Sequence, residues 1–225
     1  RMQTAMKVEF RCRGFVKAEL FTEEQAKILY EAGFRRLLVG FESGDPGILK
    51  NIKKKSTVEQ NTRCIDIAHK YNLQVKALMS IGHAGETEET IRATHDWLLK
   101  VQPEDFDCTV ITPYPSTEYY DLAVPHSTIL RAWTYTTENG DRLHSYEVDF
   151  SSDASYFKGI PGDYRSFVFT DHLSAEEIVE LRNWVENDVR HKLGIHFYPI
   201  TPASVFEHSM GMPGPLPSNI LRSTS

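Results

Sequence analysis

The sequence predicts an α/β fold made of parallel strand–helix units. Three observations predict it. The first 120 residues alternate short apolar runs with amphipathic stretches of helical period. The apolar runs begin near residues 37, 75 and 106, about 30 to 40 residues apart, which is the length of one β–crossover–β unit. Capping-box sequences precede the helical stretches. Because such crossovers are almost always right-handed, we expect neighbouring strands to follow chain order.

The first unit begins with a strand that we expect over residues 8–16, where apolar and charged residues alternate. A capping box at residues 22–25 begins a helix, which we expect to end at Gly33. The inward face of this helix consists of Ala26, Leu29 and Ala32. Residues 37–41 are nearly all apolar, so we expect a short strand that is buried on both faces.

Two further units follow the same plan. The capping box at residues 57–60 begins a helix, and residues 75–81 form the next expected strand. Residues 87–90 begin a third helix, and the strand at residues 106–111 follows it. Parallel units of this kind place ligands beyond the carboxyl ends of their strands, so candidate site residues are sought there.

The pattern changes after about residue 121. Residues 133–150 predict a hairpin around Asn139-Gly140, a dipeptide typical of tight hairpin turns. The capping box at residues 174–177 begins an amphipathic helix that we expect to end at Gly194.

We therefore predict two parts. Residues 1–121 hold the parallel βα units, and residues 122–225 form a smaller α+β extension with a hairpin, an amphipathic helix and an irregular tail. The tail is expected to be irregular because the last 25 residues are rich in Pro, Ser and Gly.

Composition narrows the function. The 225 residues are 40% hydrophobic and 25% charged, which is typical of a globular protein. The net charge of −6 disfavours a nucleic-acid partner, and the apolar runs are too short for a membrane span. Without a signal peptide, we expect a cytoplasmic protein. Three scattered cysteines without a CxxxCxxC spacing cannot by themselves ligate an iron–sulfur cluster; they are Cys12, Cys64 and Cys108.

Four expected strand ends carry short polar strings. The strings are Lys17-Ala-Glu19, Gly40-Phe-Glu-Ser-Gly-Asp45, Ile81-Gly-His-Ala-Gly-Glu-Thr87 and Thr112-Pro-Tyr-Pro-Ser-Thr117. In this order and spacing, from about Met6 to Asp121, they resemble the second half of a radical S-adenosylmethionine (SAM) enzyme core. The likeness is greatest to the group in which that core follows a cobalamin-binding domain.

The resemblance implies part of a TIM-like (β/α)6 partial barrel. In that family the first unit carries a CxxxCxxC loop for a [4Fe-4S] cluster, at which SAM is reductively cleaved. The present chain resembles units three to six, so we expect a fragment whose cluster ligands lie in N-terminal residues of the same protein. The resemblance also implies an electron donor such as flavodoxin or ferredoxin, with cobalamin as a further candidate cofactor. It leaves methyl transfer, radical rearrangement and oxidation open, and it does not identify the substrate.

The resemblance also assigns SAM-binding roles at two strand ends. Glu42 and Ser43 would contact the ribose or the amino-acid end of SAM, since a carboxylate accepts from vicinal hydroxyls or pairs with an ammonium. The alternative for Ser43 is helix capping, and Asp45 before a proline is a better cap than a ligand. Lys17 would meet the SAM carboxylate, or else form a solvated pair with Glu19.

The next two strings are assigned to the adenine. Small residues such as Gly82 let the backbone pass close to the ring, and we expect Glu86 to brace this turn. Ala84 stands where the family usually has proline, which would loosen the turn. Val110 or Ile111 would pack on the adenine, and the backbone near Thr112 would bond to it. The alternative is that these residues form a simple turn that leaves the barrel.

Several residues have simpler interpretations. Residues 53–55 are three lysines that we expect to be a solvated surface. His83 has no second ligand at metal spacing, so no metal site is expected. Tyr114 and Tyr119 are candidates to face a substrate.

Two alternatives to a radical SAM enzyme stay open. One is a non-catalytic βα binding or assembly module that has lost the cluster half of the core. The other is a metal-independent barrel enzyme in which Glu42 and Glu86 act as acid and base.

Overall fold

A computed structural model of the chain describes residues 10–148 and 164–196. The elements of the first part are β1 (Cys12–Phe15), η1 (Ala18–Leu20), α2 (Glu23–Glu31), β2 (Phe34–Glu42), α3 (Pro46–Asn51), α4 (Val58–Lys70), β3 (Gln74–Ile81), α5 (Glu88–Val101) and β4 (Asp105–Val110). The later elements are α6 (Glu118–Asp121), β5 (Val124–Pro125), β6 (Ala132–Thr136), β7 (Arg142–Tyr146), β8 (Val168–Thr170) and α7 (Ala175–Leu193).

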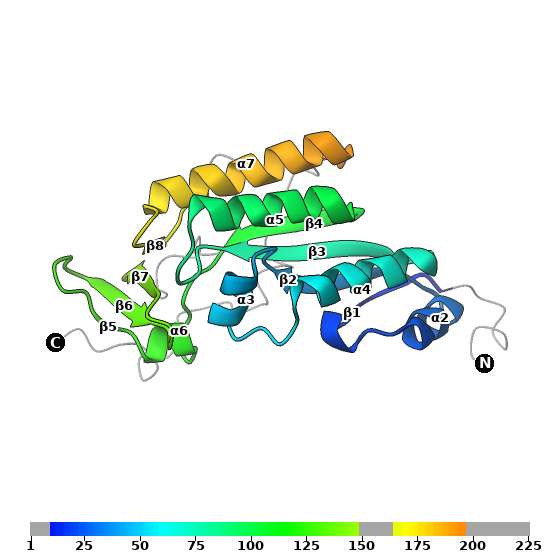
Figure 1. The fold of residues 1–225 in the computed structure, drawn as a ribbon, viewed down its shortest axis with the longest axis horizontal. Coiled ribbons are helices and arrows are strands. Elements are labelled where there is room, and N and C mark those ends of the chain that lie inside the picture. Colours follow the sequence, from blue (N-terminus) through cyan, green and yellow to red (C-terminus); the bar gives the residue numbers. More distant parts are fainter. Residues whose placement is uncertain (1–9, 149–163, 197–225) are drawn as a thin grey trace.

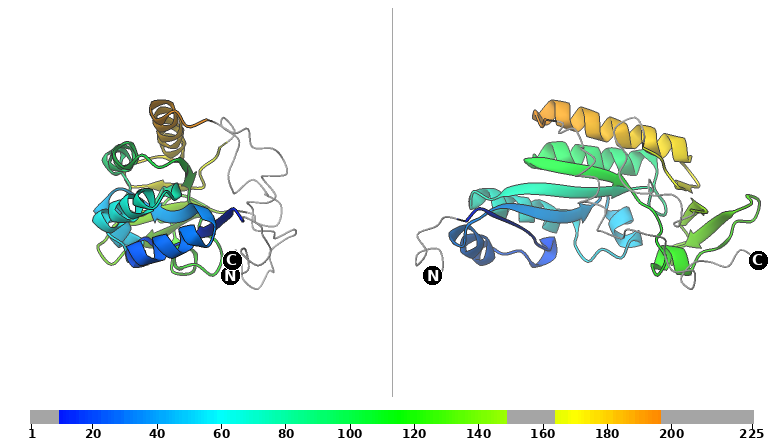
Figure 2. Two further views of the ribbon diagram at one scale, coloured as in Figure 1. Left: turned by 90° about the vertical axis from the view of Figure 1, so that its right-hand side faces the viewer. Right: turned by 180° about the vertical axis from the view of Figure 1, so that it is seen from behind.

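The first four strands form one parallel sheet, sheet A, in the order β1-β2-β3-β4. The predicted parallel βα architecture and chain-order neighbours are thus confirmed. Helices α2, α4, α5 and α7 lie in an arc along one side of the strands, as Figures 1 and 2 show. This is the layering of a partial βα barrel, with helices outside and the strand ends at its mouth.

Local sequence signals set the helix ends. All three predicted capping boxes are present, at Thr22, Thr57 and Ser174, and the structure adds a fourth at Thr87, where only a helix start was predicted. In each, the side-chain oxygen accepts from a backbone N–H three residues later, which satisfies an otherwise unpaired donor. Helix α7 ends at Gly194 in the left-handed conformation, as predicted.

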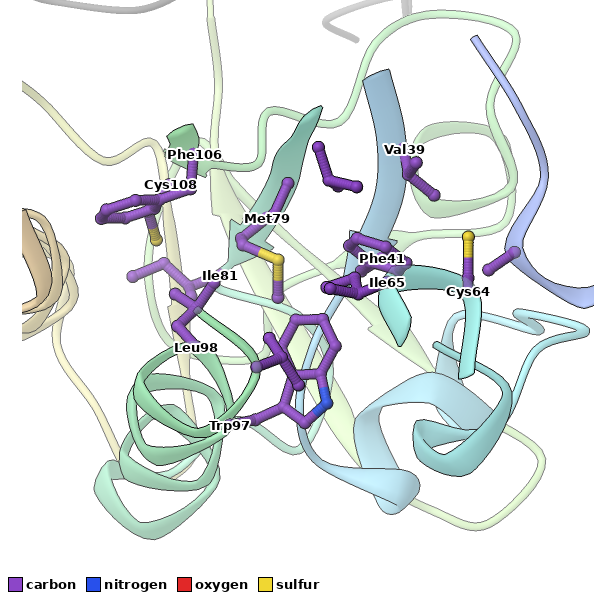
Figure 3. Packing of buried hydrophobic residues seen from close by; sticks show 14 of the residues in the cluster. Val39, Phe41, Cys64, Ile65, Met79, Ile81, Trp97, Leu98, Phe106 and Cys108 are labelled. Carbon is purple, nitrogen blue, oxygen red and sulfur yellow. The ribbon is translucent and has the colours of Figure 1, made fainter. Parts of the chain in front are cut away.

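The core lies between sheet A and its helices (Figure 3). In β2, Leu37, Val39 and Phe41 are buried on the helix side, whereas Leu38 and Gly40 on the opposite side are only half-buried. The expectation that this strand is buried on both faces is therefore wrong. The described helices cover a single face of the sheet, so the strand alternates as a half-buried strand does.

The four later strands form an antiparallel sheet, sheet B, in the order β5-β6-β7-β8. The predicted hairpin is confirmed as β6 and β7, although residues 149 and 150 of the expected range lie outside the described residues. Sheet B lies beyond the carboxyl ends of the sheet A strands (Figure 1). Its Tyr135, Leu143 and Val168 belong to the same hydrophobic cluster as the core of sheet A. The boundary near residue 121 stays a prediction.

Helix α7 closes the free edge of β4. The backbone N–H of Cys108 donates to Glu186 Oε1 at 2.7 Å, and Arg182 Nε donates to the Cys108 carbonyl at 2.8 Å. Arg190 donates to the carbonyl of Phe106. Side chains thus satisfy the backbone groups of β4 that a further strand would use, so sheet A ends here.

Three predictions fall partly or wholly outside the described residues. Strand β1 begins at Cys12, and residues 8 and 9 of the expected strand are not described. The expected irregular tail lies outside them as well. Within residues 10–148 and 164–196, no helix is long and apolar enough to cross a lipid bilayer.

Candidate functional site

The ends of neighbouring strands meet at the carboxyl edge of sheet A, as predicted. Glu42 ends β2 opposite Met79 of β3. The N–H of Ile111, just after β4, donates to the Ile81 carbonyl at 2.9 Å. Lys17 follows β1 on the same edge and is exposed. The predicted residues on these strands therefore share one rim of the sheet, with Gly82 directly after β3.

Glu42 holds the most constrained position on this rim. Its φ of 68° is uncommon for a residue with a side chain, and the pairing of β2 with β3 shifts between Gly40 and Glu42. Ser80 Oγ donates to Glu42 Oε2 at 2.7 Å, and Lys54 Nζ lies 3.2 Å from Oε1. The expectation that all three lysines are merely solvated is wrong for Lys54, which α3 and its following turn bring back to the rim.

His83 continues this polar chain. Its Nε2 lies 2.8 Å from Ser80 Oγ, and its ring is 6% exposed. Burial lowers the pKa of His83 to about 4, against the opposing effect of the Glu42 charge, so the ring is neutral at pH 7. Its Nδ1 has no hydrogen-bond partner among the described residues. A buried nitrogen of this kind is a free acceptor or donor, depending on the tautomer.

Glu86 braces the turn after β3 from within, as expected. Its Oε2 accepts the N–H groups of Gly82 at 3.0 Å and His83 at 3.1 Å, and Oε1 accepts from Thr90 Oγ1 at 3.0 Å. The side chain is 1% exposed, and burial raises the pKa of Glu86 to about 7 in spite of these bonds. Direct contact between Glu86 and a cofactor stays a prediction.

Sheet B holds the same turn from outside. Asn51 Nδ2 donates to the Ala84 carbonyl and to Asp141 Oδ2, both at 2.9 Å. Thr170 Oγ1 donates to the Glu86 carbonyl at 2.9 Å. Ala84 itself is fully buried. These bonds restrain the turn from α3 and sheet B, and the expectation that alanine at this position loosens it stays a prediction.

Ser43 points away from the rim. It is 1% exposed, its Oγ lies 3.1 Å from Thr94 Oγ1 of α5, and it accepts the N–H of Asp45 at 3.0 Å. Its predicted SAM contact stays a prediction, and the side chain already serves the local turn. Asp45 caps α3 by accepting the N–H of Ile48 at 2.9 Å, as expected.

The segment after β4 places aromatic side chains beside His83. Ile111 and Thr112 are half-buried, and their assigned adenine contacts stay predictions. The ring of Tyr119 lies 6.2 Å from that of His83, between centroids, and 4.9 Å from that of Tyr135. Tyr119 therefore packs beside the polar chain rather than at an open surface.

The cysteines do not fit an iron–sulfur cluster. Cys64 and Cys108 are buried on the helix side of sheet A, and burial raises the pKa of Cys64 to about 12 and that of Cys108 further. Metal ligation needs the thiolate, so both thiols are held in the wrong form. No group of three or more His, Cys, Asp or Glu side chains that could hold a metal ion occurs within the described ranges.

Sequence reasoning missed four residues that shape the site: Lys54, Ser80, Asn51 and Thr170. Ser80 did leave a signal, because it is the one polar residue in the otherwise apolar run at residues 77–81. The other three act on residues far along the chain and have no local pattern.

A parallel βα sheet with polar residues at its carboxyl edge is the arrangement of barrel-type folds, whose ligands bind at that edge. Residues 2–98 match the family model described as the radical SAM superfamily. An uncharacterized methyltransferase of Pyrococcus horikoshii is 32% identical over 123 residues, which are 54% of this chain and 27% of that protein. Over residues 2–98, which are fewer than half of its 225 residues, the chain is similar to the radical SAM superfamily.

Other similar proteins share shorter or more distant regions. Bacteriochlorophyllide d C-12(1)-methyltransferase of Chlorobaculum tepidum is 28% identical over 99 residues, 44% of this chain and 22% of that protein. The chain thus spans about a quarter of the length of these curated relatives. Among solved structures, the radical SAM methyltransferase TsrM of Kitasatospora setae is 22% identical with a TM-score of 0.49, covering 58% of this chain and 27% of TsrM. Coproporphyrinogen III oxidase of Escherichia coli, also a radical SAM enzyme, is 14% identical with a TM-score of 0.44, covering 48% and 25%.

Proposed function

We propose that this chain forms the C-terminal half of the core of a radical SAM methyltransferase and supplies strand ends that bind SAM. The family match over residues 2–98 carries the proposal, and the names of two relatives favour methyl transfer over other radical chemistry. Bound SAM would supply the methyl group or the radical. The substrate is not assigned, because the fold alone does not choose one.

Glu42 is the residue best suited to hold SAM. A carboxylate offers about four lone-pair positions, and the hydrogen bonds from Ser80 and Lys54 use two of them. The remaining positions can accept from the two ribose hydroxyls or from the ammonium of SAM. The residues present therefore fit this ligand. Lys17, exposed on the same rim, would meet the SAM carboxylate.

Other parts of the protein would supply what these residues lack. The [4Fe-4S] cluster would be ligated by residues N-terminal to this segment, since the described cysteines do not fit it. Cobalamin is a candidate second cofactor because of the resemblance at the strand ends. An electron donor such as flavodoxin or ferredoxin, and with it a cytoplasmic location, belongs to the same proposal.

The deciding experiment uses the longest protein that contains this chain, reconstituted anaerobically with iron, sulfide and a reductant. A methyltransferase converts SAM to S-adenosylhomocysteine and a methylated product, whereas reductive cleavage gives 5′-deoxyadenosine and methionine. We expect both SAM-derived products. Formation of 5′-deoxyadenosine alone would point to rearrangement or oxidation. Formation of neither would favour the non-catalytic module, or the barrel enzyme that uses Glu42 and Glu86.

A further inference from the structure

The hydrogen-bond chain Glu42–Ser80–His83 has one proton arrangement. The Ser80 hydroxyl carries a single hydrogen, and the Glu42 carboxylate, paired with Lys54, can only accept. Ser80 therefore donates to Glu42. Its oxygen must then accept from His83 Nε2, which lies 2.8 Å away.

This direction defines the tautomer of His83. The ring is neutral at pH 7, because burial lowers its pKa, so it carries one ring hydrogen. That hydrogen is on Nε2, where it donates to Ser80. Nδ1 is left with a lone pair and has no partner in the described part of the chain. The histidine thus acts as the fixed outer end of the chain, since its ring is buried against Tyr119.

The other end of the chain is a carboxylate that needs support. Glu42 sits at a positive φ, at an irregular point of the β2–β3 pairing, and its side chain is partly open to solvent. A carboxylate in such a position would otherwise sample several rotamers. The hydrogen bond from Ser80 holds Glu42 Oε2 in place. Because the Ser80 oxygen already accepts from His83 Nε2, its hydroxyl hydrogen points toward Glu42.

We propose that Ser80 and His83 are positioning residues, which hold the Glu42 carboxylate in the orientation that binds SAM. The proposal rests on the proposed function for its ligand. It assigns His83 a polar role through Ser80 rather than contact with a metal. Pre-organisation of this kind improves binding because the carboxylate loses less freedom when the ligand arrives.

Three variants test the proposal on the chain itself. Ser80→Ala cuts the link to Glu42. His83→Leu removes the donor to Ser80 and fills the buried position with an apolar side chain. His83→Gln is the matched control, because its side-chain amide nitrogen can donate to Ser80 as Nε2 does. Urea unfolding of each variant establishes that it is folded before binding is compared.

The first measurement is NMR of the imidazole nitrogens. We expect His83 to be neutral with its hydrogen on Nε2, and we expect Ser80→Ala to mix in the other tautomer. The second is an NMR titration with S-adenosylhomocysteine, which detects weak binding. We expect Ser80→Ala and His83→Leu to weaken binding about tenfold, and His83→Gln to bind within about twofold of the unmodified chain.

The two hypotheses fail in different ways. Unchanged affinity in both Ser80→Ala and His83→Leu, with normal binding by the unmodified chain, would overturn the positioning role and leave the proposed function intact. A hydrogen on Nδ1 in the unmodified chain would also overturn it. If neither the unmodified chain nor Glu42→Gln binds S-adenosylhomocysteine, SAM binding by these residues is refuted. The tautomer of His83 then decides by itself whether the hydrogen-bond chain Glu42–Ser80–His83 exists.

Discussion

Glu186 accepts the backbone N–H of Cys108 at 2.7 Å, although the two residues are 78 positions apart in the chain. The same carboxylate bonds Arg182 at 3.3 Å and Arg190 at 2.6 Å, and it is 3% exposed. One buried carboxylate thus joins two buried arginines of α7 to the free edge of β4. The edge is closed by charge and hydrogen bonds instead of by another strand.

Replacing Glu186 should therefore destabilise the fold strongly. Glu186→Ala leaves the Cys108 N–H without its acceptor and the buried Arg182 guanidinium without its counter-charge, whereas Arg190 keeps its ion pair with Asp105 at 3.3 Å. We expect the free energy of unfolding to fall by about 3 to 5 kcal/mol. Urea unfolding measures this loss. Glu180→Ala, on the exposed side of the same helix, is the control and should change stability by less than about 0.5 kcal/mol. Equal effects of both variants would contradict the edge-closing role.

Alanine substitutions at Gly82 and Gly140 distinguish the cost of backbone strain from the cost of steric crowding. Both have positive φ, 87° and 92°, but a Cβ on Gly82 would lie 2.9 Å from Val168 Cγ2, whereas nothing lies within 4 Å of one on Gly140. Gly140→Ala should cost about 1 kcal/mol for conformation alone. Gly82→Ala should cost about 1 to 3 kcal/mol more. Adding Val168→Ala should restore only part of the unfolding free energy that Gly82→Ala removes, because the strain of a positive φ remains. Thermal or urea unfolding of these variants measures this.

Asn51 couples the hairpin of sheet B to the turn after β3. Asn51→Ala removes the bonds to the Ala84 carbonyl and Asp141, so we expect a loss of about 1 to 3 kcal/mol. In Asn51→Ala, the rate of amide hydrogen exchange should rise at Gly85 and Glu86 more than it rises in the helices. Glu138→Ala, in the same hairpin turn and exposed, is the comparison. Unchanged exchange at the turn would show that the hairpin does not restrain it.

The sequence predicts those features that depend on near neighbours. Each capping box joins residues three apart, so composition and spacing reveal it directly. The parallel order of strands follows from repeat length and handedness. In contrast, Ser80 and Glu42 are 38 residues apart, and Arg182 and Cys108 are 74 apart. No local sequence pattern predicts such pairs, because they depend on how distant elements pack against each other. The strand-end strings located the rim, but not which side chains turn toward it: Ser43 faces α5.

Glu86 should make stability depend on pH in a definite direction. Its folded pKa is raised from 4.5 to about 7, so between these values the folded state holds more protons than the unfolded state. The stabilising contribution is full below about pH 4.5 and is lost as pH rises through 7. His83, whose pKa is lowered to about 4, contributes the opposite slope between about pH 4 and 6.5.

Glu86→Gln isolates this effect, because glutamine keeps an oxygen for the Gly82 and His83 N–H groups and does not titrate. We expect the unfolding free energy of the unmodified chain, minus that of Glu86→Gln, to fall by about 3 kcal/mol from pH 4.5 to 7. The His83 contribution is common to both proteins and cancels in this difference. A difference that is flat or rises with pH would show that Glu86 is ionised throughout.

Iron binding tests whether the described residues can hold a cluster. Cys64 and Cys108 are buried as thiols on different elements, so anaerobic incubation of this chain with iron and sulfide should leave no stoichiometric iron after desalting. A variant with Ala at Cys12, Cys64 and Cys108 should retain the same trace amount. Iron and sulfide that stay with the unmodified chain and are absent from the variant would show that these cysteines ligate a cluster. The same incubation of a longer protein with a CxxxCxxC segment should give bound iron, because there exposed thiolates are available as ligands.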